Sequence, residues 1–135
     1  MRRRKTLTNC DLGYIAFNLS EATIEKLRQA FPPRHERFIC RHATVTFGVR
    51  SETPLPQGPF SLEVIGYTDD GLGVEALVVK VDGDLRRPDG GIYHITHSLA
   101  AGRNAVESNE VIVKLGWELV EQPVAVTATL CWNPL

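Results

Sequence analysis

Residues Phe60–Val81 have the sequence FSLEVIGYTDDGLGVEALVVKV, and this segment sets the fold class. Two apolar runs, 60–67 and 74–81, are rich in residues that favour β-strands, and the Asp and Gly residues between them favour a tight turn. The segment therefore predicts a β-hairpin of two antiparallel strands.

Around this hairpin the sequence predicts two helices and several further strands. Ser20 is expected to cap an amphipathic helix with apolar residues at 24, 27 and 31, which Pro32 ends. A second, short helix is expected to begin at the cap Ser108 and to end at Gly116. Strands are expected over 12–17, 38–49, 92–99, 117–120 and 124–132. A mainly β chain with two helices belongs to the α+β class rather than to the doubly wound α/β class.

Length and composition indicate one globular domain. The chain has 135 residues, and its 43% hydrophobic and 23% charged content is that of a protein with a packed core. We expect a basic, polar tail over 1–11 and a single domain over 12–135. The longest apolar stretches, 76–79 and 124–128, are far shorter than the ~18 residues that a membrane span requires. No apolar block follows the basic start, so a cytoplasmic location is expected. We also expect a monomer that makes no contact with a membrane.

Charge and cysteine content restrict the partners and cofactors. The net charge of −1 argues against binding of long duplex nucleic acid by charge alone. Three cysteines, Cys10, Cys40 and Cys131, have no CxxC spacing, which predicts free thiols rather than disulfides or a thiolate zinc site. No metal or cofactor is expected. A small nucleotide or an RNA terminus fits this composition as a ligand.

Two predicted strands carry the same short pattern, His-x-Thr, as His42-Ala-Thr44 and His94-Ile-Thr96. Because side chains alternate along a strand, each strand presents one imidazole beside one hydroxyl on the same face. Thr46 is expected to continue this face in the first strand, with Phe47 on the opposite, core-facing side. His97 is expected on the core side of the second strand, as a packed or hydrogen-bonded histidine. Its spacing from the preceding histidine is unsuited to holding a metal.

Two imidazoles and two hydroxyls suit phosphodiester chemistry. One proton must leave the attacking oxygen and another must reach the leaving oxygen, and imidazole, with a pKa of about 6.5, performs either task near neutral pH. The threonine hydroxyls can hydrogen-bond the phosphoryl oxygens. One His-x-Thr could simply be tolerated on a half-buried strand, but two copies in a chain with four histidines favour a function.

The paired motifs resemble those of the 2H phosphoesterase superfamily, and the likeness extends over residues 13–132. Within that superfamily the chain is similar to a subgroup that includes tRNA-ligase-like RNA-repair domains and phage anti-CBASS nucleases. The motif matches are 42–48 and 93–96, and the weaker flanking matches are 13–17, 31–33, 66–67 and 108–110.

The resemblance implies a bilobal α+β fold, in which two pseudo-symmetric antiparallel sheet lobes with flanking helices surround a central cleft. It implies metal-independent hydrolysis of a cyclic nucleotide or of a 2′,3′-cyclic phosphate at an RNA end. His42 and His94 would form the acid/base pair, and Thr44 and Thr96 would bind the phosphate. The alternative is a binding module in RNA repair that holds a nucleotide or an RNA end without turnover.

Further substrate contacts follow from the same resemblance. Tyr14 would stack on a base or bond a phosphate, and Glu110 would line the substrate end of the cleft. Thr46 is a further candidate substrate contact, because strand alternation predicts it on the same face as Thr44. The alternatives are a core aromatic for Tyr14 and an exposed first-turn helix carboxylate for Glu110. Individual arginines are candidates for extra phosphate contacts, namely Arg41, Arg50, Arg86, Arg87 and Arg103.

Overall fold

The predicted hairpin forms two interior strands of the sheet. In the computed structural model, which describes residues 12–135, β4 (Leu62–Asp69) pairs with β5 (Val74–Val81) in antiparallel register. The Asp70 side chain stabilises the turn by accepting hydrogen bonds from the backbone N–H groups of Leu72 (2.8 Å) and Val74 (3.0 Å). Both strands and the turn therefore form where the sequence predicts them.

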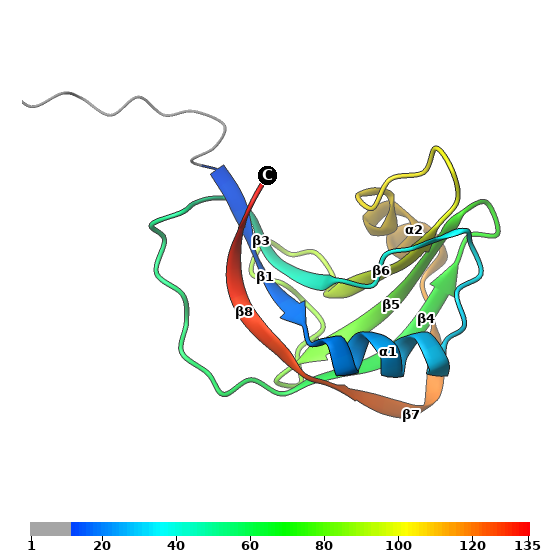
Figure 1. The fold of residues 1–135 in the computed structure, drawn as a ribbon, viewed down its shortest axis with the longest axis horizontal. Helices are drawn as coiled ribbons and strands as arrows, with labels where there is room; N and C mark the ends of the chain where they lie inside the picture. The colour runs from blue at the N-terminus through cyan, green and yellow to red at the C-terminus, as the bar shows by residue number, and fades with distance from the viewer. Residues whose placement is uncertain (1–11) are drawn as a thin grey trace, which may run out of the picture.

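The α+β class is confirmed, with an antiparallel sheet that curls strongly and two helices (Figure 1). The sheet has the strand order β7-β4-β5-β6-β3-β1-β8, and β2 pairs with β6. The other elements are β1 (Leu12–Leu19), α1 (Glu21–Ala30), β2 (Arg37–Phe38), β3 (His42–Arg50), β6 (His94–Leu99), α2 (Glu107–Leu115), β7 (Glu118–Val126) and β8 (Ala128–Pro134).

The described strands form one continuous sheet, so the predicted division into two sheet lobes is not confirmed. The tail predicted over 1–11 lies outside the described residues. Within the described part of the chain, neither helix has the length and apolar character needed to cross a bilayer.

The two helices cover opposite faces of the sheet. Leu27 of α1 is fully buried in the main core, which includes Ile95 of β6. Ile112 of α2 packs with Ala76 and Val78 of β5 in a second cluster. Because both faces of β5 are covered, its sequence is an almost unbroken apolar run rather than an alternating pattern.

Only one of the two predicted helix caps forms. The Ser20 hydroxyl accepts a hydrogen bond from the backbone N–H of Thr23 at 3.2 Å, as predicted. The prediction for Ser108 is wrong, because α2 begins at Glu107 and its N-cap position, Val106, makes no side-chain cap bond. Ser108 is fully buried instead, with its hydroxyl turned toward the sheet.

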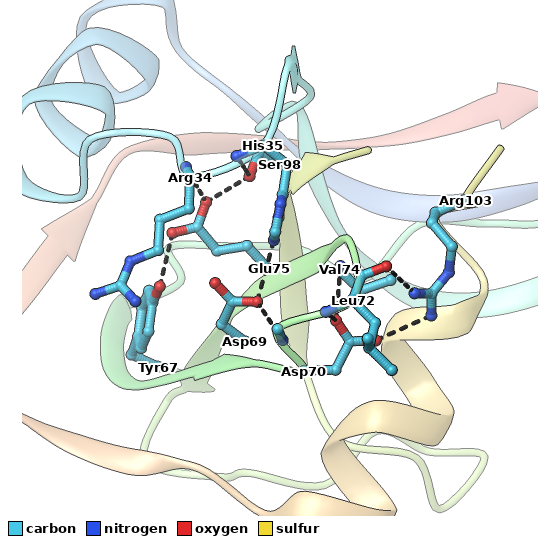
Figure 2. Close-up of polar contacts among 11 residues, drawn as sticks. Arg34, His35, Tyr67, Asp69, Asp70, Leu72, Val74, Glu75, Ser98 and Arg103 are labelled. Atoms are coloured by element: carbon cyan, nitrogen blue, oxygen red, sulfur yellow. Dashed lines mark hydrogen bonds and ion pairs between the residues drawn. The ribbon is translucent and has the colours of Figure 1, made fainter. Parts of the chain in front are cut away.

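A buried carboxylate ties the loop after α1 to the hairpin (Figure 2). Glu75 of β5 is 1% exposed and accepts hydrogen bonds from the Ser98 hydroxyl (2.5 Å), the Tyr67 hydroxyl (2.9 Å) and the Arg34 backbone N–H (3.2 Å). Three donors compensate for the removal of this carboxylate from water. The network therefore fixes the loop on the face of the sheet that α1 covers.

Arg103 fixes the loop that leads into α2 (Figure 2). Its guanidinium donates to Asp70 at 2.9 Å and to Glu107 at 3.0 Å. The hairpin turn and the first turn of α2 are thereby joined through one side chain. This connection holds Ala105 and Val106, which reappear below as part of the cavity wall.

Candidate functional site

The two His-x-Thr motifs meet at the centre of the sheet. Their middle residues, Ala43 of β3 and Ile95 of β6, are paired across the two strands, and both are fully buried on the core side. The flanking histidines and threonines therefore share the opposite face. All four line a single cavity of about 410 Å³, together with Tyr14, Ile39, Phe47, Arg87, Ala105, Val106 and Asn109.

The pairing also sets which groups are neighbours. Ala43 and Ile95 are the one paired position between β3 and β6, and the charge of His42 acts on His94 across this junction. Each imidazole has a threonine hydroxyl two residues away on the same face of its own strand. A phosphoryl group placed between the motifs would be within reach of an imidazole on either side.

His94 is the more buried of the two imidazoles, with 9% of its surface exposed. Its Nδ1 donates a hydrogen bond to the Ile92 carbonyl at 2.8 Å, which leaves Nε2 as the acceptor in the neutral ring. Burial lowers the pKa of His94, the Ile92 carbonyl opposes this, and the positive charges of Arg87 and His42 lower it further. The net effect is a lowered pKa, which favours the neutral imidazole of His94.

His42 occupies a more open position on β3 and is half-buried. The Tyr14 ring lies against it, with the ring centroids 5.1 Å apart and the planes tilted by 45°. Burial lowers the pKa of His42, and the charge of Arg41 adds to that effect. The charge of His42 in turn lowers the pKa of His94, so the charge states of the two rings are linked.

The hydroxyl of Thr96 is positioned by α2. Its Oγ1 lies 2.8 Å from the Ser108 Oγ and 3.3 Å from the Ala105 carbonyl. If Ser108 donates to Thr96, the Thr96 proton is free to move from the Ala105 carbonyl to a bound oxygen. Ser108 is thus a supporting residue of the site that sequence reasoning assigned to a helix cap.

A β-bulge in β3 changes which residues face the cavity. Ile15 of β1 pairs with Thr46 and the next residue pairs with Thr44, so Val45 is an extra residue in β3. The bulge reverses the alternation, and Phe47 lines the cavity whereas Thr46 does not. The prediction that Phe47 faces the core is therefore wrong. Its ring is 62% exposed and stacks on Tyr14 at a centroid distance of 5.9 Å.

Tyr14 and Glu110 differ in where the structure places them. Tyr14 lines the cavity, and its ring lies against those of His42 and Phe47. Glu110 is not among the cavity-lining residues; its side chain is 65% exposed and forms an ion pair with Lys114 at 2.5 Å. The neighbouring Asn109 lines the cavity instead.

His97 is packed and hydrogen-bonded in the core, which confirms the prediction. It is fully buried, and its Nε2 donates to the Phe31 carbonyl at 2.6 Å. Its ring meets the rings of Phe31 and Phe38 edge-on. It therefore contributes to the core on the face opposite the two motifs.

No thiol of the described chain lines this cavity. Cys40 and Cys131 are free thiols, and burial raises the pKa of Cys40 to about 12. Among residues 12–135 no three His, Cys, Asp or Glu side chains are grouped so as to hold a metal ion.

No protein-family model, curated protein or solved structure matches the chain. The function of the chain is therefore inferred from the residues and geometry of the cavity.

Proposed function

We propose that the protein is a metal-independent phosphodiesterase that hydrolyses a cyclic nucleotide or a 2′,3′-cyclic phosphate at an RNA end. The observation that carries this proposal is that both His-x-Thr motifs line one cavity, with their middle residues Ala43 and Ile95 paired across the sheet. Two imidazoles and two hydroxyls supply the proton transfers and the phosphate contacts that this reaction needs.

The geometry suggests a role for each histidine. His94 acts as the general base, because its anchored Nδ1–H leaves Nε2 as a fixed acceptor and its surroundings favour the neutral ring. Nε2 takes a proton from water while the water oxygen bonds to phosphorus. The bond from phosphorus to the sugar oxygen breaks, and His42 donates a proton to that oxygen. Thr44 and Thr96 donate hydrogen bonds to the two non-bridging oxygens.

The cavity walls favour a nucleotide as the substrate. A volume of about 410 Å³ lies within the range of small-molecule sites. Tyr14 and Phe47 form a stacked aromatic pair at its edge, and aromatic rings of this kind bind nucleobases by stacking.

The resemblance to 2H phosphoesterases also suggests how the sheet is organised. β3 and β6 meet at the single paired position Ala43 and Ile95, whereas the pairings on either side are longer. We assign this junction as the boundary between two lobes, β8-β1-β3 and β7-β4-β5-β6, with one motif at the edge of each.

A substrate screen tests the proposal. The protein is incubated in EDTA with 2′,3′-cyclic mononucleotides, cyclic dinucleotides and RNA ending in a cyclic phosphate, and products are identified by mass. We expect hydrolysis of at least one of these diesters in the chelator, because hydroxyls and imidazolium supply the charge stabilisation. Activity that disappears in EDTA and returns with a divalent metal would contradict the mechanism.

The double variant His42→Ala/His94→Ala is the matched control in this screen. Any activity that it retains belongs to a contaminant. Binding of a nucleotide by the parent without turnover of any substrate would indicate the alternative, a binding module for nucleotides or RNA ends.

A further inference from the structure

Arg87 is a buried arginine in the wall of the cavity. It lies in the connection between β5 and β6, lines the cavity beside His94, and has only 8% of its side chain exposed. One Nη donates to Asp89 at 2.5 Å. Its Nε is buried and has no hydrogen-bond partner within the described chain.

A guanidinium N–H that is buried without an acceptor is unfavourable, because the group has lost water and gained nothing in exchange. Such groups in native structures call for an explanation, and an anionic ligand is one. Arg87 is the only arginine, lysine or carboxylate residue among the described residues that line the cavity. An anion entering the cavity would therefore meet a guanidinium whose Nε–H has no acceptor.

The turn around Arg87 holds its side chain in place. The Arg87 backbone donates to the Gly91 carbonyl at 2.7 Å and accepts from the Gly90 N–H at 2.9 Å. Asp89, which binds the guanidinium, also accepts from the Gly91 N–H at 3.0 Å. A Cβ at position 91 would lie 3.5 Å from the Arg87 Cδ and Nε, so the side chain runs closely along this glycine. The guanidinium is thus fixed before any ligand binds.

We propose that Arg87 is the anion-binding residue of the cavity and donates hydrogen bonds to a phosphoryl oxygen of the bound nucleotide. The inference rests on the proposed function and adds a permanently charged contact, which the two motifs lack. A planar guanidinium binds phosphate oxygens well, and its charge is worth most where water is excluded. The ligand class is a phosphate mono- or dianion, which includes the phosphomonoester product as well as the diester substrate.

The test measures phosphate binding separately from turnover. Titration calorimetry with inorganic phosphate and with an adenosine 2′- or 3′-monophosphate compares the parent with Arg87→Gln. The matched control is Arg86→Gln, which removes the same charge from an exposed neighbour that does not line the cavity. We expect Arg87→Gln to weaken binding by about 10-fold to 100-fold, the loss typical of a hydrogen bond to a charged group, and Arg86→Gln to leave it nearly unchanged.

Arg87→Lys covers the case in which the glutamine variant fails to fold. Lysine keeps the charge but cannot donate from the Nε position. We therefore expect Arg87→Lys to bind phosphate more weakly than the parent does, but less weakly than a folded Arg87→Gln variant. Phosphate affinity equal to the parent in a folded Arg87→Gln or in Arg87→Lys would overturn the inference.

The two proposals can fail separately. Turnover in the screen with phosphate affinity independent of Arg87 would reject this inference and keep the phosphodiesterase. Phosphate binding that depends on Arg87, without turnover of any diester, would reject the phosphodiesterase and keep the anion site.

Discussion

At the scale of single residues, the two imidazoles of the cavity have different surroundings. His94 is almost buried and is anchored through Nδ1, whereas His42 is half-buried and lies against the Tyr14 ring. Burial lowers the pKa of both below the usual value of about 6.5. The chemistry requires one to be neutral while the other is protonated.

The pH dependence of turnover tests this pair. We expect kcat/KM, which reports the free enzyme, to follow a bell whose centre lies below about pH 6.5, because both pKa values are lowered. The limbs belong to the coupled pair rather than to either residue. A bound phosphate favours imidazolium, so the bell for kcat should lie at higher pH.

The measurement is a set of initial rates from about pH 4.5 to 9 for the parent and for His97→Asn, with chemistry shown to be rate-limiting. The variant should keep both limbs, since His97 lies in the core on the opposite face. A profile with one limb in the parent would contradict catalysis by two histidines.

The sequence predicts the face on which a strand side chain lies where side chains alternate regularly between the two faces. The prediction fails where a bulge interrupts this alternation. The faces of His42, Thr44 and His97 follow from the period of two in a strand. Thr46 and Phe47 exchange faces because Val45 is an extra residue opposite β1. No local signal marks that bulge, which depends on the register between two strands.

At the scale of elements, α2 supports the second motif. Ser108 on its first turn lies 2.8 Å from the Thr96 hydroxyl. Ser108 precedes a run of residues that favour a helix, and this position predicts a helix cap. In the fold, Ser108 is buried against β6, and its hydroxyl pairs with that of Thr96 instead. The burial of Arg87 was likewise not predictable, because it depends on how the loop over 82–91 folds against the sheet.

A double-mutant cycle tests the role of Ser108. We expect Ser108→Ala to lower kcat/KM by about 5-fold to 10-fold, the usual value of one neutral hydrogen bond, with little change in phosphate affinity. In a Thr96→Val background the same substitution should have almost no further effect, because Ser108 acts through Thr96. Equal losses in the two backgrounds would assign Ser108 a structural role only.

At the scale of the whole molecule, the central hairpin and the helix positions follow from sequence, whereas the curl and continuity of the sheet do not. β4, β5 and the turn between them are encoded locally. How β3 meets β6 depends on long-range contacts, and no local pattern in the sequence predicts that all described strands join one sheet.

The fold also lowers the pKa values of three histidines, the buried His94 and His97 and the half-buried His42. Below about pH 6.5 the unfolded chain binds protons at these positions more readily than the folded one, so the free energy of unfolding rises with pH in this range. Stability is therefore fully present above the unfolded pKa and is lost as the pH falls toward the lower folded pKa values.

Urea unfolding at pH 7.5, 6.0 and 5.0 measures this effect. We expect the free energy of unfolding to fall steadily over the three values. His97→Gln, which keeps a donor for the Phe31 carbonyl, should be less stable at pH 7.5 and should lose less on acidification. The same pH dependence in parent and variant would show that His97 does not contribute to it.

The division of labour between His42 and His94 is the central claim, and the leaving group of the substrate tests it most directly. The measurement compares kcat for the parent, His42→Ala and His94→Ala in EDTA on two diesters that the parent hydrolyses, one releasing a sugar alkoxide and one releasing p-nitrophenolate. Both variants should lose about 10²-fold to 10⁴-fold on the first diester, the usual range for a missing acid or base. On the second, which needs no proton to leave, His42→Ala should recover to within about 10-fold of the parent, whereas His94→Ala should not recover. Near-parent turnover by either variant on the alkoxide diester, or equal losses on the two diesters for His42→Ala, would contradict the account.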